Sequence, residues 1–300
     1  MRFPSRALTA CVLVIGALAT GCGSPSAPAS DTPSPPASEA LTATEVAARY
    51  GYDLASAALT PVYALVPEHR DPRDVYARNL LLRQCLEGIA EFQVVPPGAE
   101  SDPGFDPRTG QRVFAEEIAA QWGYQLPPPA VTVVRPDAET YTPAVEEKGL
   151  RCGERTRERL GVPPERLLND IESAGWAAVG ASDEVTTAAG AWRACMAPAG
   201  VPDLPDRPQE MPSASVVPPM STREQDRPPG STEPSARERE VAVMDARCRE
   251  EADVDGAELR ARAEAELAAI GRDVDGFESV RRDYQEYDAE IDQVIEELGS

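Results

Sequence analysis

The first 22 residues constrain this chain most, because they indicate the compartment in which it folds. Arg2 and Arg6 form a short positive segment, and an uncharged apolar run from Ala7 to Thr20 follows it. A cationic start, an apolar middle and small residues at the end are typical of a secretory signal peptide. The run is shorter than the roughly 20 residues that a membrane-spanning helix needs. We therefore expect residues 1–21 to be a signal peptide and the remaining residues to be exported.

The end of this segment, Leu18-Ala19-Thr20-Gly21-Cys22, resembles a bacterial lipoprotein signal, although the leucine stands one place earlier than is usual in that family. The resemblance implies that Cys22 is the lipidated residue and becomes the new N-terminus. Two acyl chains hold a protein stably at a bilayer, at about 0.8 kcal/mol for each buried methylene. The alternative is simple cleavage with an incidental cysteine. Cys11 is a poorer acceptor because only a few apolar residues precede it.

Residues 22–40 are dense in proline, serine and alanine. Such a composition cannot bury a core, so we expect a tether that lifts the ectodomain from the lipid headgroups. The roughly 260 residues that follow are enough for one large or two small domains. We expect helical unit 1 at 41–180 and helical unit 2 at 181–300, with a proline-rich excursion at 198–235 that does not pack.

Beyond Cys11 and Cys22 the chain has four cysteines, which are Cys85, Cys152, Cys195 and Cys248. An even number of cysteines in an exported chain indicates disulfides, here two. Four cysteines allow three connectivities, and the sequence alone leaves all three open. A metal site is disfavoured, since no C-x-x-C or neighbouring histidine accompanies these residues.

Apolar residues recur with helical spacing along most of the ectodomain, which predicts an all-α, disulfide-stapled fold. Thr44, Asp71 and Asp183 are the expected caps of three helices, and the Asp71-Pro72 pair is the strongest of these starts. The expected helices are 45–59, 72 to about 92, 113–122, 143–160, 164–179, 183–196 and three more from about 236 onward. A brief strand at Val131–Val134 is the one exception.

The last helix carries an a/d pattern over Phe277, Val280, Tyr284, Tyr287, Ile291, Val294 and Leu298. One interpretation is a coiled-coil contact with a partner or a second copy. We favour packing within the chain, against Leu259, Ala263, Leu267 and Ile270, because that adjacent face is already apolar.

The segments LRQCL at 82–86 and WRACM at 192–196 are similar, and each precedes a second helical cysteine, in RCGE at 151–154 and RCRE at 247–250. If one helix–Cys–loop–Cys–helix unit is used twice, its bonds are Cys85–Cys152 and Cys195–Cys248. Each bond would then contribute roughly 4 kcal/mol on the loop-entropy account.

The second of these units is similar to a set of secreted, alanine-rich actinobacterial proteins. They carry W-x-x-C-M in one helix and D-x-x-C in the next long helix, which are 192–196 and 245–248 here. The resemblance covers about the last 115 residues. It implies a helical, disulfide-bonded, exported protein, with a weak association to cell-envelope transport or wall systems, and it transfers no catalytic residue.

The sequence offers no catalytic constellation. Its one histidine, His69, is expected to be a solvated loop residue, and the G-x-S-x-G, H-E-x-x-H, G-x-G-x-x-G and P-loop motifs are absent. Two D-V-D-G segments, at 253–256 and 273–276, invite a calcium interpretation. However, Arg262 and Arg282 occupy the position where a bidentate glutamate belongs. We therefore expect helix caps there, as Asp255–Glu258 and Asp275–Glu278 capping boxes, and no catalytic residue, metal or cofactor.

A net charge of −22 argues against nucleic acid, whose phosphates require basic clusters. We expect a lipid-anchored protein on the extracytoplasmic face of the cell membrane that acts as a non-catalytic interaction or accessory module of the envelope. We leave its protein partner and its oligomeric state open. The first alternative is a small-ligand binding lipoprotein, which a pocket lined by Trp122, Trp176 or Trp192 would favour. The second, a carboxylate-dependent hydrolase, needs two acids that converge in a cleft.

Overall fold

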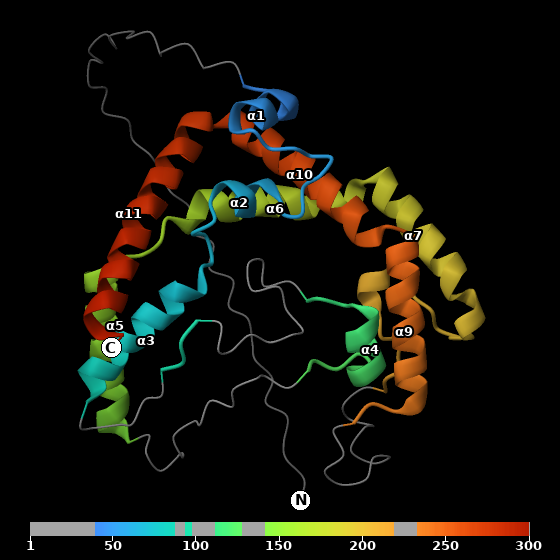
Figure 1. Cartoon of the computed structure of the whole chain (residues 1–300), viewed down its shortest axis with the longest axis horizontal. Coiled ribbons are helices and arrows are strands. Elements are labelled where there is room, and N and C mark those ends of the chain that lie inside the picture. The colour runs from blue at the N-terminus through green and yellow to red at the C-terminus, as the bar shows by residue number, and fades with distance from the viewer. Residues whose placement is uncertain (1–39, 88–93, 98–111, 128–141, 219–232, 300) are drawn as a thin grey trace, which may run out of the picture. The chain divides into compact units, whose positions relative to one another are not determined.

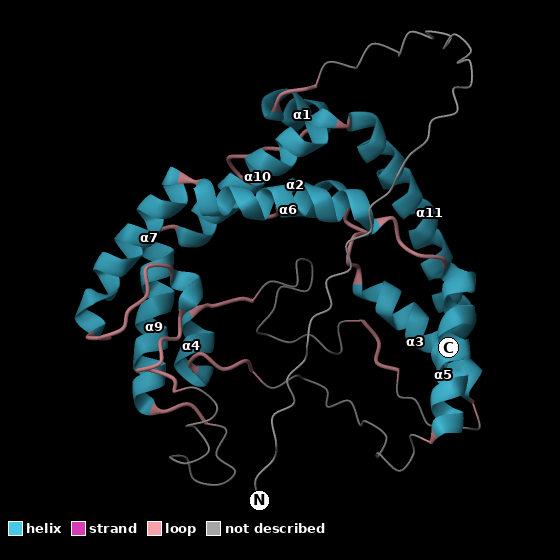
Figure 2. Cartoon of the chain, turned by 180° about the vertical axis from the view of Figure 1, so that it is seen from behind, coloured by secondary structure: helices cyan, strands magenta, loops and turns pink. Residues whose placement is uncertain are grey.

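The computed structural model describes residues 40–87, 94–97, 112–127, 142–218 and 233–299. Within these ranges the chain forms helices and loops and no β-strand (Figure 2), which confirms the predicted all-α class. The predicted signal peptide, Cys22, the tether up to residue 39 and the brief strand at 131–134 all lie outside the described residues. Among the helices of the described ranges, none combines the length and the apolar character that crossing a bilayer requires.

The helices carry the labels of Figure 1. They are α1 (Ala43–Tyr50), α2 (Pro61–Leu65), α3 (Pro72–Leu86), α4 (Glu116–Trp122), α5 (Pro143–Leu160), α6 (Glu165–Ala181), α7 (Asp183–Met196), η2 (Ala197–Ala199), η3 (Pro208–Glu210), α9 (Ala236–Glu251), α10 (Val254–Arg272) and α11 (Val274–Leu298). Helix α5 has the expected bounds, and α6 lies within two residues of its expected range.

Three clusters of buried apolar side chains form the core. The first cluster joins α4, α7, α9 and the start of α10, and Trp192 and Val241 are fully buried in it. The second joins α1, α2, α6, α10 and the first half of α11 around Leu168 and Ile270. The third joins α3, α5 and the second half of α11 around Ala77 and Ile291. Helix α6 packs along α10, so the second cluster is built from helices of both predicted units (Figure 1).

The a/d residues of α11 are used within the chain, as favoured from the sequence. Phe277 and Tyr284 share the second cluster with Leu267 and Ile270. The later positions pack instead against Ala77 of α3 and other residues of the third cluster. Leu259 and Ala263 take no part in these two clusters, because α11 diverges from α10 and meets α3 and α5.

Several predicted helix starts are one or two residues too late. The first helix is capped by Thr42, which forms a capping box with Glu45, and α7 is capped by Ser182. Helix α1 also ends early, at Tyr50, because Gly51 adopts a left-handed conformation with φ of 65°. Helix α3 begins at the predicted Asp71 cap and ends at Leu86 rather than near residue 92.

The predicted capping boxes at Asp255 and Asp275 are also wrong, because both helices begin two residues earlier than predicted. The caps of α10 and α11 are Asp253 and Asp273, the first aspartates of the two D-V-D-G segments. Helix α9 ends at Glu251, two residues before Asp253, and α10 ends at Arg272, directly before Asp273, so each new helix begins after a very short turn. The glycine of each motif lies three residues into the helix, directly under the aspartate side chain.

The proline-rich region was expected not to pack, and this is wrong for residues 201–217. Met211, Val216 and Val217 are buried in the first cluster, where Ala199 also lies. Proline content discouraged a helix here, but it did not prevent apolar side chains from reaching the α7–α9 surface. Residues 219–232 of the same region lie outside the described part of the chain.

Replacing Gly276 by alanine is expected to destabilise the protein by about 1 kcal/mol, the usual value of an N-cap. A Cβ there would lie only 2.2 Å from Asp273 Oδ2. The carboxylate would have to leave the Gly276 amide from which it accepts a hydrogen bond at 3.0 Å. Urea unfolding at neutral pH would measure the change.

The matched control is Gly153→Ala in α5, where nothing lies within 4 Å of the added Cβ. In that open helical position alanine should stabilise by up to about 1 kcal/mol. If both variants changed the free energy of unfolding in the same direction, the result would contradict the role assigned to Asp273.

Candidate functional site

The W-x-x-C-M and D-x-x-C motifs meet across α7 and α9. Trp192 Nε1 donates a hydrogen bond of 2.8 Å to Asp245 Oδ1. Three residues further along both helices, Cys195 and Cys248 form a disulfide with a Cα–Cα distance of 5.6 Å. Two links one helical turn apart hold the register of the two helices. The spacing of the motif is therefore explained by this pairing.

Asp245 is fully buried, and several donors satisfy its charge. Besides Trp192, it accepts hydrogen bonds from the Tyr124 hydroxyl at 2.9 Å and from Arg249 Nε at 2.8 Å. Burial and the Asp245 charge both raise the pKa of Tyr124, so its hydroxyl stays a donor. A buried carboxylate needs such partners because its desolvation is costly.

The second disulfide, Cys85–Cys152, joins α3 to α5 with a Cα–Cα distance of 5.8 Å. Both disulfides thus have the pairing that the internal repeat implied. The residues three places earlier are Leu82 and Gly149. These cannot form a side-chain hydrogen bond, so the two halves of the repeat share the disulfide and not the polar link.

His69 was expected to be solvated, and this is wrong: it is 2 % exposed. Its Nδ1 lies 2.9 Å from the Tyr284 hydroxyl and its Nε2 lies 3.4 Å from Glu172 Oε1. The turn that follows α2 carries it inward: the His69 amide donates a hydrogen bond of 2.9 Å to the Val66 carbonyl oxygen, and Val66 is itself buried. A tyrosine, a histidine and a glutamate in this order are the kind of arrangement that can transfer protons. However, Glu172 is only 5 % exposed and Tyr284 only 2 %, so no substrate reaches them in this conformation.

A second buried carboxylate, Glu266 of α10, lies in the same region. Its Oε2 accepts a hydrogen bond of 3.1 Å from the Val62 amide, and its Oε1 lies 3.4 Å from Arg262 Nη2. Burial raises the pKa of Glu266, and these partners only partly offset the effect. Burial also acts to raise the pKa of Glu172. There, however, the polar contacts with His69 and Tyr63 and the Arg70 charge outweigh burial and hold the pKa below its ordinary value.

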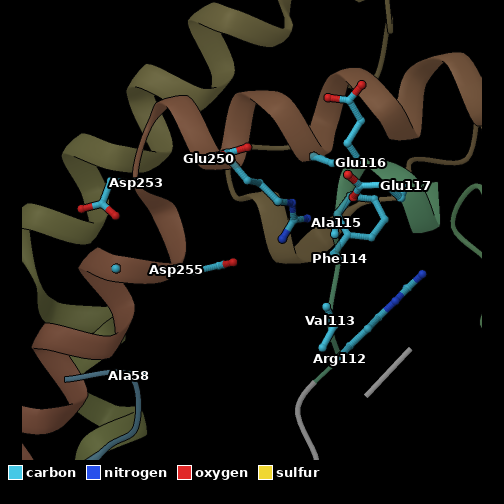
Figure 3. Close-up of a pocket in the computed structure, with 13 residues that line it drawn as sticks. Ala58, Arg112, Val113, Phe114, Ala115, Glu116, Glu117, Glu250, Asp253 and Asp255 are labelled. Atoms are coloured by element: carbon cyan, nitrogen blue, oxygen red, sulfur yellow. The ribbon is translucent and has the colours of Figure 1, made fainter. Parts of the chain in front are cut away.

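A pocket with a volume of about 680 Å³ lies between the residues before α4, the end of α9 and the start of α10. Arg112 and Phe114 line one side, and Asp253 and Asp255 lie across from them (Figure 3). The Phe114 ring stacks on Tyr124 at a centroid distance of 5.4 Å. Tyr124 therefore connects the two features, since its ring stacks on Phe114 of the pocket and its hydroxyl donates a hydrogen bond to Asp245.

A groove of about 580 Å³ lies beside Trp176, between α6, α7 and the η3 segment. Trp176 is 50 % exposed, and its ring is held by Arg262, whose Cζ lies 4.0 Å from the ring centroid. Small and polar residues, among them Ala189, Gly190 and Thr186, complete the lining.

The two segments considered for calcium serve as helix starts. Asp253 is paired with Arg260 and Asp273 caps α11. Within the described ranges no three His, Cys, Asp or Glu side chains gather in a way that could hold a metal ion. Sequence reasoning missed Arg112, Arg249 and the buried glutamates. Glu172 and Glu266 also contact residues distant in the chain, His69 and Val62, and Arg112 approaches Arg249 only in the folded protein. Only Asp245 was marked in the sequence, because it is the first residue of the D-x-x-C motif at 245–248.

Comparisons with protein-family models, with curated proteins and with solved structures found no match to this chain.

The two buried glutamates predict opposite responses to pH. Because the pKa of folded Glu172 is lowered, its contribution to stability is present above the ordinary carboxyl pKa of about 4.3 and is lost as the pH falls through the folded value. Glu172→Gln should therefore lose less stability than the wild type between about pH 5 and about pH 3.

For Glu266 the folded pKa is raised, so its ionisation opposes folding at neutral pH. Its contribution grows more favourable as the pH falls through the folded value toward about 4.3. Glu266→Gln should remove that gain. Urea unfolding at a series of pH values between neutral and about pH 3 would measure both effects. The control is Glu154→Gln on the exposed face of α5. Parallel pH profiles for all three variants would contradict these assignments.

Proposed function

We propose that this protein is a lipid-anchored extracytoplasmic lipoprotein that acts through protein contacts as an accessory module of the cell envelope. The observation that carries the proposal is the pair of disulfides, Cys85–Cys152 and Cys195–Cys248. Bonds of this kind form and persist in oxidising compartments. They agree with the export that the Arg2–Cys22 segment predicts.

Two further features support an interaction role. The apolar face of α11 is used within the chain, yet other large aliphatic side chains stay in contact with solvent. Val75 of α3 is 58 % exposed, Leu150 of α5 is 66 % exposed and Val162, just after α5, is 73 % exposed. All three residues lie on or directly after the disulfide-linked helices α3 and α5, so they offer apolar surface there to a partner protein.

The lipid anchor is tested by metabolic labelling with a palmitate analogue. The wild-type chain should incorporate the label and appear in the membrane fraction, whereas Cys22→Ala should do neither. Cys11→Ala is the matched control and should be labelled like the wild type. Equal labelling of the wild type and Cys22→Ala would refute the lipoprotein assignment.

The interaction role is tested separately by crosslinking in whole cells and identification of the partner. A defined envelope protein should be recovered with the wild type, and its yield should fall when Leu150 is replaced by glutamate. Recovery of no specific partner from correctly anchored protein would refute the accessory role and leave the anchor intact.

A second candidate function is the binding of a small ligand, and the groove beside Trp176 is the observation that favours it. Its volume of about 580 Å³ lies within the range of small-molecule sites. A half-exposed aromatic ring fixed by Arg262 provides a rigid wall with both apolar and polar neighbours.

This candidate predicts that native mass spectrometry of the protein, purified from its own cells, detects a bound molecule of defined mass. Trp176→Ala should lose that molecule, and Leu150→Ala should retain it. A molecule retained in both variants would place it elsewhere, and no added mass in the wild type would refute the candidate.

A further inference from the structure

Two arginines share one aromatic ring in the pocket of Figure 3. Arg112 Cζ lies 5.2 Å from the Phe114 ring centroid and Arg249 Cζ lies 5.1 Å from it. Arg112 precedes α4, whereas Arg249 belongs to α9, and both line the pocket. Two neighbouring guanidinium groups repel each other, and their pairing is notable in a chain with a net charge of −22.

Both guanidinium groups retain donors that the described residues do not use. Arg112 donates through Nη2 to the Tyr124 and Gln125 carbonyl oxygens. Arg249 donates through Nε and Nη2 to Asp245 and, through Nη2, to the Pro208 carbonyl oxygen. A guanidinium has five N–H groups, so Nε and Nη1 of Arg112 and Nη1 of Arg249 are left for a ligand. Burial lowers the pKa of Arg112 and the Arg249 charge lowers it further, a combination that a bound anion would offset.

The other charged residues of the lining are acidic. Glu116 is paired with Arg247 and Asp253 is paired with Arg260. Asp255 and Glu250 have no ion pair within the described part of the chain, and Figure 3 places Asp255 across the pocket from Arg112 and Phe114. A simple anion would be repelled by these carboxylates, and a simple cation would be repelled by the arginines. A ligand with a charge of each sign at its two ends meets a complementary partner at both walls.

The volume of the pocket and its apolar lining residues narrow the class of ligand further. A volume of about 680 Å³ admits a ligand of several residues' size and falls within the range of small-molecule sites. Val113, Ala58 and Ala246 are among the apolar residues that line the pocket. They would contact small aliphatic side chains of the ligand and provide no hydrogen-bond partner for polar groups in its central part.

We propose that this pocket binds a short peptide with free termini, its carboxylate on Arg112 and Arg249 and its ammonium group on Asp255. The site goes beyond the proposed envelope role and does not depend on the lipid anchor. It also lies apart from the Trp176 groove, so a ligand in that groove would neither support nor weaken it.

The test is isothermal titration calorimetry, in which the full chain is titrated with three matched probes. The probes are trialanine, N-acetyl-trialanine, which lacks the ammonium group, and trialanine amide, which lacks the carboxylate. Trialanine should bind saturably, and the loss of either charge should weaken binding at least tenfold, or about 1.4 kcal/mol.

Arg112 is the residue to vary, because it lies at the pocket edge and is not part of the buried bonds around Asp245. Arg112→Gln should weaken trialanine at least tenfold and leave the weak binding of the amide unchanged. Asp255→Asn should reduce the preference for trialanine over its N-acetyl form. Arg155→Gln, on the exposed face of α5, is the control and should bind like the wild type.

Three results would overturn the proposal. Equal binding of N-acetyl-trialanine would make this a simple anion site. No saturable binding of trialanine by the folded wild type would remove the site altogether. Unchanged binding in Arg112→Gln would place the peptide elsewhere on the protein.

Discussion

Helix α10 carries two charged residues into the centre of the second core cluster, and the helices around it are arranged to accept them. Glu266 is fully buried and Arg262 is 3 % exposed. The carboxylate takes the Val62 amide and the Arg262 guanidinium as partners, and Arg262 also stacks on Trp176. A buried pair of this kind is weak evidence of stability, but breaking it would leave an uncompensated charge. The positions of α2 and α6 relative to α10 follow from this requirement.

One glycine makes the close approach of α6 to α10 feasible. A Cβ on Gly175 would lie 2.9 Å from Glu266 Oε1. No side chain larger than hydrogen leaves room for the carboxylate, so the helix pair depends on this position. The same carboxylate then reaches the Val62 amide, which ties the short helix α2 to the α6–α10 pair.

The cross-links act on a different part of the folding equilibrium. A disulfide stabilises mainly by restricting the unfolded chain, by roughly 4 kcal/mol for loops of this length. The Trp192–Asp245 hydrogen bond acts on the folded state, and a bond to a charged group contributes about 1.5–3 kcal/mol. The two together fix the α7–α9 register, whereas the α3–α5 pair combines its disulfide with the apolar packing of Ala77 and Leu160. The Arg112–Arg249 pocket is built on the more constrained of the two pairs, since Arg249 also holds Asp245.

Local features of the sequence determined the all-α class, most helix positions, the cysteine pairing implied by the repeat and the apolar face of α11. Each of these depends on residues within a few turns of one another or on a repeated segment. The exact caps differed, because a helix begins where the preceding turn allows, as at Asp253 and Asp273.

Only the tertiary structure decided the environment of His69, the packing of residues 201–217 and the opposed pKa shifts of Glu172 and Glu266. It alone brought Arg112 to Arg249. His69, Glu172 and Glu266 meet residues far away in the chain, and residues 201–217 pack against the helices that precede and follow them. Neither burial nor the sign of a neighbouring charge follows from local spacing, because both depend on which distant helix covers the side chain.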